Sequence, residues 1–199
     1  MQTRPIEAIV IGGSAGALDA LAALLPALPA GCPFPVAIVV HVPANKPSYL
    51  AEVLASKTVL PVKEAEDKEP IAPGVVYIAP PNYHLLIERG RTFALSDDQV
   101  LHFSRPAIDV LFESAAEAYG DRLAGVVLTG ASEDGAAGLA AIKRAGGLAI
   151  VQSPATASAR PMPEAAIAAA EVDHILPVVE IAPLLAQLAG GARRPEEAR

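Results

Sequence analysis

The sequence contains no tryptophan and a single cysteine, Cys32, among its 199 residues. One cysteine excludes an internal disulfide, which fits a reducing compartment such as the cytoplasm. Basic residues are also scarce, with 15 Lys and Arg against 22 Asp and Glu, so the formal net charge at pH 7 is −7. Nucleic-acid binding requires clustered basic side chains. The composition therefore argues against DNA or RNA as the main partner.

The chain also lacks an uninterrupted apolar segment long enough to cross a membrane. Residues 20–40 carry no charge, but a glycine and several prolines interrupt them: Pro26, Pro29, Gly31, Pro33 and Pro35. These residues would break a membrane-spanning helix, so a helix, a loop and a strand explain the run better. Near the N-terminus, Glu7 and Asp19 interrupt the pattern of a signal peptide. We expect a protein that is neither membrane-embedded nor exported.

Short apolar runs alternate with helical patterns along most of the chain. The runs "AIVI", "VAIVV" and "AGVVLT" each lead to a loop and then to apolar residues at helical spacing. This alternation is typical of βα units in a parallel sheet. With 52% hydrophobic residues and 199 residues in all, the chain suits one α/β domain with one sizeable core.

Residues 61–96 have a different character. The strand-like pieces "VVYIA", "HLLIE" and "TFALS" are separated by turn residues, which predicts antiparallel hairpins at a sheet edge. Other patterns predict a strand at "LAIV" and helices over 18–28, 108–119, 136–145, 163–170 and 181–188. We expect one domain over residues 1–190, followed by a frayed, charged tail over residues 191–199.

Ser14 lies among glycines where the first apolar run ends and a helical pattern begins. The segment "GGSAG", from Gly12 to Gly16, fits G-x-S-x-G, a sharp turn that exposes a serine nucleophile. Backbone N–H groups at the start of the helix can stabilise an oxyanion, and we expect Ala15 to supply one. Two alternatives stay open: a helix-capping serine in a glycine turn, and a phosphate-binding loop, whose glycine spacing this segment does not match.

His41 and Asp134 are the candidates to activate that serine. His41 ends the run "PVAIVVH", at the edge of the sheet where βα loops gather. Asp134 follows another apolar run and precedes a helix, so it is either an orienting acid or a helix cap; Glu133 is the nearby rival. Ser14, His41 and Asp134 make a candidate catalytic triad that needs no metal or cofactor. Other histidines have less clear routes to that edge: His84, His102 and His174.

Several longer motifs occur in a recognisable order: "IGGSAGALDAL", "VVHVP", "VKEAED", "APGVVYIAP", "RPAIDVLF", "LTGASEDGAAGLAAIKRAGG" and "MPEAAI". Together they resemble the catalytic domain of the chemotaxis protein-glutamate methylesterases, the CheB family, from Ile9 to Leu188. Each motif alone is weak, but the combination is specific.

The resemblance implies a doubly wound, mostly parallel sheet with helices on both faces and an antiparallel hairpin at one edge. It implies a cytoplasmic hydrolase that cleaves glutamyl methyl esters on the cytoplasmic helices of chemoreceptors, releases methanol and often deamidates glutamines. The family's nucleophile maps to Ser14, its histidine base to His41 and its orienting aspartate to Asp134.

The chain departs from the family pattern beside the expected site. Ala15 replaces a common threonine, Ala131 replaces a usual methionine, and Pro161 stands where glycine is common. The backbone N–H groups of Ala15 and Ala131 remain for the oxyanion or the substrate. Arg105 matches a family arginine and is expected to hold an anionic substrate segment; a solvated charge beside a helix start is the alternative.

A further departure concerns regulation. Family members typically carry an N-terminal receiver domain, whereas the serine turn begins here at Gly12. We expect a stand-alone esterase that is either always open or controlled by a separate response-regulator protein. The substitutions around the site leave a second hypothesis, a catalytically degenerate member that binds a receptor or signalling partner.

Overall fold

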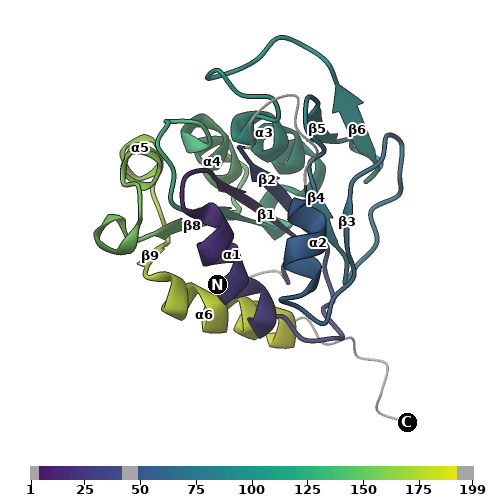
Figure 1. Ribbon diagram of the computed structural model, residues 1–199, viewed down its shortest axis with the longest axis horizontal. Helices are drawn as coiled ribbons and strands as arrows, with labels where there is room; N and C mark the ends of the chain where they lie inside the picture. Colours follow the sequence, from purple (N-terminus) through teal and green to yellow (C-terminus); the bar gives the residue numbers. More distant parts are fainter. Residues whose placement is uncertain (1–4, 42–48, 192–199) are drawn as a thin grey trace.

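The computed structural model describes residues 5–41 and 49–191. Within them, a seven-stranded sheet has the order β3-β4-β2-β1-β7-β8-β9, and its strand pairs are parallel (Figure 1). The strands are β1 (Ala8–Gly13), β2 (Val36–Val40), β3 (Val62–Glu64), β4 (Val76–Ile78), β7 (Leu123–Val127), β8 (Leu148–Gln152) and β9 (His174–Leu176). Chain order reverses at β1, which lies between β2 and β7. Such a reversal is where ligands bind in open α/β sheets.

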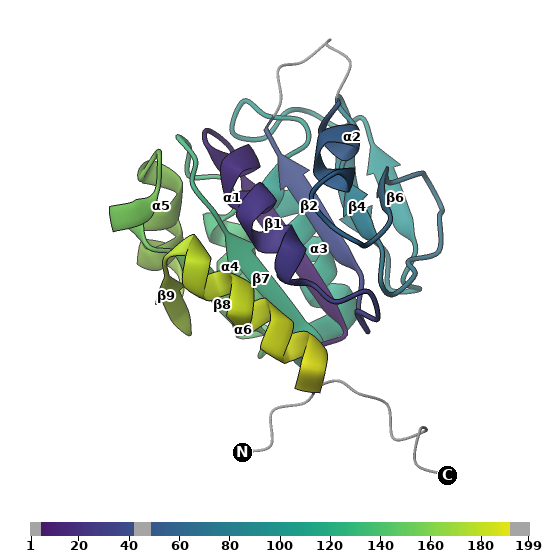
Figure 2. The same cartoon turned by 60° about the horizontal axis from the view of Figure 1, so that its bottom comes forward.

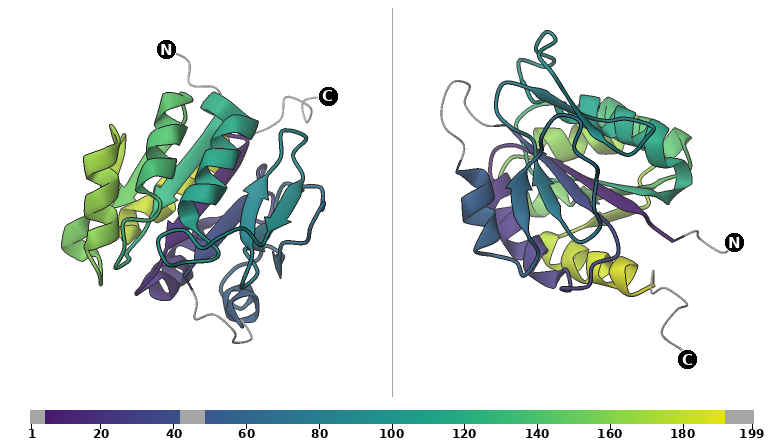
Figure 3. Two further views of the ribbon diagram at one scale, coloured as in Figure 1. Left: turned by 90° about the horizontal axis from the view of Figure 1, so that it is seen from above. Right: turned by 90° about the vertical axis from the view of Figure 1, so that its right-hand side faces the viewer.

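Helices cover both faces of this sheet, as Figures 2 and 3 show. One face carries α1 (Ala17–Leu24), α2 (Leu50–Ala55) and α6 (Val178–Gly191); the other carries α3 (Ile108–Tyr119), α4 (Ala136–Arg144) and α5 (Pro161–Ala169). Successive strand residues point to opposite faces. Accordingly, Ile9 and Ile11 pack on the α1 side, and Val10 packs on the α3 side. The predicted α/β class and doubly wound sheet are confirmed.

A separate two-stranded antiparallel sheet pairs β5 (His84–Ile87) with β6 (Phe93–Ser96). Leu85 and Phe93 pack into the core on the α3 side. The predicted hairpin is therefore present. The prediction that the whole of residues 61–96 forms antiparallel hairpins is wrong, because β3 and β4 join the main sheet in parallel. The residues of β4 are all buried, and a continuous apolar run is typical of such a strand.

Several local details also differ from the sequence predictions. The sequence patterns did not indicate α2 or β9, which are short, and α6 begins at Val178, before the predicted start. Leu18, the first residue of the helix predicted over 18–28, is 41% exposed. Residues 192–199 of the predicted tail lie outside the described residues. Within the described ranges, no helix combines the length and apolar character needed to cross a bilayer.

The packing of α3 allows a test of the core. Phe112 is fully buried in the cluster between α3 and the sheet. Phe112→Ala is expected to lower the free energy of unfolding by about 3–5 kcal/mol, because it removes the ring and leaves a cavity. Urea unfolding followed by circular dichroism measures this. Phe103→Ala, at a fully exposed site, is the control and should change stability by about 0.5 kcal/mol or less. A loss below about 1 kcal/mol for Phe112→Ala would contradict the packing.

Candidate active site

Ser14 and His41 lie side by side because of the register between two strands. Gly13, the last residue of β1, pairs with Val40, the last residue of β2. Ser14 and His41 directly follow these two residues. The N–H of His41 donates to the carbonyl of Gly13 at 3.2 Å. Since paired strands lie about 4.8 Å apart, the register brings the hydroxyl and the imidazole to the same sheet edge.

The strand on the other side of β1 completes this arrangement. The N–H of Ser14 donates to the carbonyl of Thr129, just beyond β7, at 2.9 Å, and the Thr129 hydroxyl donates to the carbonyl of Ala15 at 2.8 Å. Gly16 then starts α1 with φ 80°, and a Cβ on it would lie 2.7 Å from the Cβ of Ser158. The turn therefore requires glycine at this position.

Two backbone N–H groups near Ser14 are available to a substrate. Gly130 lies against the serine so closely that a Cβ on it would be 3.0 Å from the Cβ of Ser14. Ala131 follows and is exposed, as is Ala15. Among the described residues, the N–H groups of Ala15 and Ala131 have no hydrogen-bond acceptor. Free donors beside a nucleophile are what an oxyanion hole requires.

His41 is oriented by a buried carboxylate. Its Nε2 lies 2.7 Å from Oδ2 of Asp134, and the side chains are 12% and 0% exposed, respectively. The second ring nitrogen, Nδ1, is left for other contacts. Among the described residues, no hydrogen bond joins Ser14 Oγ to His41, a type of contact that often tightens only when substrate binds.

Asp134 also binds the beginning of helix α3. Its Oδ2 accepts the N–H of Ile108 at 2.7 Å, and its Oδ1 accepts the N–H of Asp109 at 3.0 Å. Burial alone would raise the pKa of Asp134. The hydrogen bond from His41 and the two N–H groups outweigh burial and hold this pKa below 3.8. The carboxylate is therefore ionised at neutral pH and favours the imidazole orientation.

Asp109 is a site residue that the sequence analysis missed. Its Oδ1 accepts the N–H of Gly135 at 2.9 Å and that of Gly138 at 2.7 Å, at the start of α4. Asp134 thus binds the start of α3, the helix that carries Asp109, and Asp109 binds the start of α4, the helix that follows Asp134. Burial raises the pKa of Asp109, and the charge of Asp134 adds to this, while the Gly138 N–H opposes it. The signal in the sequence was an acid three residues before Phe112, on the apolar stripe of the helix.

His102 extends this network to the surface. Its Nε2 lies 3.3 Å from Oδ2 of Asp109, and its Nδ1 lies 3.5 Å from a carboxylate oxygen of Glu133. Glu133, considered as the rival orienting acid, therefore faces His102, while Asp134 takes His41. No sequence pattern placed His102 here, because a loop rather than a strand carries it.

Arg105 holds the same loop. Its Nη1 donates to the carbonyls of Asp97 at 2.5 Å and Asp98 at 2.9 Å. The expected contact with an anionic substrate segment stays a prediction.

Pro161 is the first residue of α5 and is exposed.

One group of side chains has a geometry suited to a metal ion. Among the described residues, ligand atoms of His102, Asp109 and Asp134 lie within 4.8 Å of one another. However, both oxygens of Asp134 and Oδ1 of Asp109 already accept backbone N–H groups. These oxygens thus already serve as hydrogen-bond acceptors for the starts of two helices, a role that accounts for the cluster. Cys32 is buried, and burial raises the pKa of its thiol, which makes it a poor nucleophile.

Comparisons with known proteins agree with this fold. A CheB methylesterase family model matches residues 9–185. A relative from Leptospira interrogans is 50% identical over 182 residues, which is 92% of this chain and 94% of its own length. An Archaeoglobus fulgidus protein named protein-glutamate methylesterase/protein-glutamine glutaminase is 40% identical over 87% of this chain and 51% of its own. The chain thus spans about half of that longer relative.

A solved structure is similarly close. The Thermotoga maritima CheB methylesterase catalytic domain superposes with a TM-score of 0.88 at 36% identity, covering 93% of this chain and all of that one. The fold and the matches define the class as an α/β hydrolytic enzyme. The chain belongs to the CheB methylesterase family.

The lowered pKa of Asp134 predicts a pH-dependent stability. A carboxyl group whose pKa is lower in the folded protein stabilises the fold above its unfolded pKa, and this contribution is lost as pH falls through the folded value. At pH 7 the free energy of unfolding of wild type should exceed that of Asp134→Asn by about 1–3 kcal/mol. The difference should shrink as pH falls below 3.8, the ordinary value. Urea unfolding at pH 7 and at a pH below 3.8 measures this difference. Asp19→Asn, at an exposed aspartate, is the control. A constant difference would contradict the assignment.

The reciprocal helix contacts predict a role for Asp109. Asp109→Ala should lower the free energy of unfolding by about 1–2 kcal/mol, because the N–H groups of Gly135 and Gly138 lose their acceptor. Asp109→Asn retains an acceptor oxygen and should lose less. Thermal and urea unfolding of the two variants test this. Equal losses in both would mean that the charge, rather than the hydrogen bonds, is what matters.

Proposed function

We propose that this chain hydrolyses γ-glutamyl methyl esters on a signalling protein and releases methanol, with Ser14 as the nucleophile. The observation that carries the proposal is the 2.7 Å contact between His41 and the buried Asp134, at a strand end adjacent to that of Ser14. Two relatives named protein-glutamate methylesterase/protein-glutamine glutaminase, at 40% and 43% identity, support the same activity.

In this mechanism the Ser14 hydroxyl attacks the ester carbonyl while His41 takes its proton. Asp134 stays ionised and stabilises the imidazolium that forms. His41 then gives the proton to the leaving methoxide, methanol departs, and a glutamyl ester of Ser14 remains. Water, deprotonated by His41, cleaves this ester and regenerates the serine. No step draws on a metal or a cofactor.

The N–H groups of Ala15 and Ala131 stabilise the negative charge that develops on the carbonyl oxygen. A single donor of this kind contributes about 3–4 kcal/mol to lowering the barrier. Because these donors belong to the backbone, the alanines that replace the usual side chains leave this function in place. The same steps deamidate a glutamine when ammonia replaces methanol as the leaving group.

Catalysis explains the site better than a partner-binding role alone. Taking a carboxylate out of water is costly unless it is paired and hydrogen-bonded. Asp134 is fully buried and pairs with an imidazole that is 12% exposed. A binding surface has no need of this pair, whereas a serine hydrolase depends on it.

The cytoplasmic helices of chemoreceptors are the proposed substrates, and the cytoplasm is the proposed location. A separate response-regulator protein is the proposed controlling partner. We assign the catalytic unit to residues 1–190 and treat the charged residues 191–199 as a tail.

Replacing the nucleophile should abolish the activity. Ser14→Ala is expected to reduce methanol release from methylated receptor membranes by about 10⁴-fold or more. Ser56→Ala, at an exposed serine at the C-terminal end of α2, is the matched control and should keep the wild-type rate. A serine-directed fluorophosphonate should label wild type at Ser14, and His41→Ala should greatly slow the labelling. Normal methanol release by Ser14→Ala would disprove the mechanism.

A further inference from the structure

A tight turn over Leu101–Ser104 lies within the loop between β6 and α3, and this loop projects at the top of Figure 1. The N–H of Leu101 donates to the carbonyl of Ser104 at 3.1 Å, and the N–H of Ser104 donates back at 2.8 Å. The two central residues, His102 and Phe103, have φ values of 49° and 60°. A turn of this type normally uses asparagine and glycine, because bulky side chains are disfavoured at positive φ.

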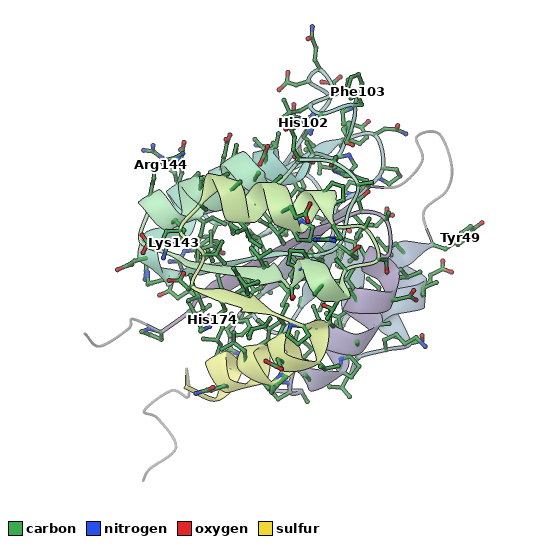
Figure 4. All side chains as sticks on the ribbon, turned by 90° about the vertical axis from the view of Figure 1, so that its left-hand side faces the viewer. Tyr49, His102, Phe103, Lys143, Arg144 and His174 are labelled. Atoms are coloured by element: carbon green, nitrogen blue, oxygen red, sulfur yellow. The ribbon has the colours of Figure 1, made fainter. Side chains whose placement is uncertain are left out.

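The side chain of Phe103 extends into solvent. The sequence has four phenylalanines; Phe34, Phe93 and Phe112 are fully buried, whereas Phe103 is 101% exposed. Figure 4 shows it beside His102 near the top of the molecule. Two neighbours, Val100 at 58% and Leu101 at 40%, enlarge this exposed apolar group. The folded chain gains no packing from an aromatic ring in this conformation.

The turn is nevertheless held firmly beside the active site. His102 contacts Asp109 and Glu133, and its ligand atom lies within 4.8 Å of one on Asp134. At the base of the loop, Nε2 of the buried His84 lies 3.0 Å from the carbonyl of Gln99, and Arg105 binds two further carbonyls. These contacts tie the backbone of the turn to residues around the candidate active site.

We propose that the Leu101–Ser104 turn is a docking element for the protein that carries the ester, with Phe103 inserting into an apolar patch on that protein. This rests on the proposed function, since an ester on a protein side chain reaches Ser14 only if the surrounding polypeptide contacts the rim of the site. Exposed aromatic residues often act as anchors at interfaces. The flanking carboxylates of Asp97 and Asp98 are exposed, so the complementary patch carries basic side chains at its border.

Phe103→Gly separates docking from turn formation. Glycine adopts the positive φ without strain, so the variant should keep or raise the melting temperature. On methylated receptor membranes its KM should rise about tenfold, with kcat unchanged within a factor of about two. On a small ester, N-acetylglutamate γ-methyl ester, its rate should match wild type. Phe103→Leu retains an apolar contact, so its KM on the membranes should lie between those of wild type and Phe103→Gly.

Val179→Ser is the matched control. Val179 is 75% exposed on α6, which covers the opposite face of the sheet from α3, so this variant should match wild type on both substrates. The KM of wild type on the membranes should also rise with salt, because the border of the contact is charged. An unchanged KM for Phe103→Gly, or a KM insensitive to salt, would overturn the proposal.

Other outcomes would also overturn it. An equal loss of rate by Phe103→Gly on the small ester would mean that the turn acts on the site itself. A change in oligomeric state on size exclusion would mean that Phe103 contacts a second copy of this chain. Failure of the proposed function is distinguishable, because Ser14→Ala would then retain the wild-type rate on both substrates, whatever the Phe103 variants do.

Discussion

The buried carboxylate of Asp134 is the interaction on which the site depends. It connects three parts of the molecule, since it holds the His41 ring from β2, binds the first N–H groups of α3, and directly precedes α4. A lone buried carboxylate would be unstable, and its proximity to Asp109 adds repulsion. The positive ends of two helices compensate for both effects. The charge that orients the imidazole therefore exists because two helices begin at the same place.

The sequence predicted the parts of this arrangement that depend on strand ends. Ser14, His41 and Asp134 each follow an apolar run, and parallel strands bring such positions to one edge. Asp109 could not be found in this way, because its partners lie in the next βα unit; its place on the apolar stripe of its helix was unusual for an acid but did not indicate what it contacts. The contact is tertiary, so a local pattern does not contain it.

The errors in the fold prediction have a similar origin. Turn residues around "VVYIA" indicated a hairpin, yet β4 pairs with β2 far away in the chain. The connection returns through α2 and β3, which are too short to give a clear periodic signal. Leu18 lies at helical spacing from Leu21, which is fully buried, yet it is 41% exposed itself. Spacing predicts which face of a helix is apolar, whereas neighbouring elements determine how far that face is covered.

The pairing of Gly13 with Val40 also constrains how this chain can vary. An extra residue in a loop at the opposite edge would leave the reacting groups where they are. An extra residue within β1 or β2 would shift one strand by a step and turn its terminal side chain to the other face. Insertions and deletions in this lineage should therefore accumulate in the loops and avoid the interiors of those two strands.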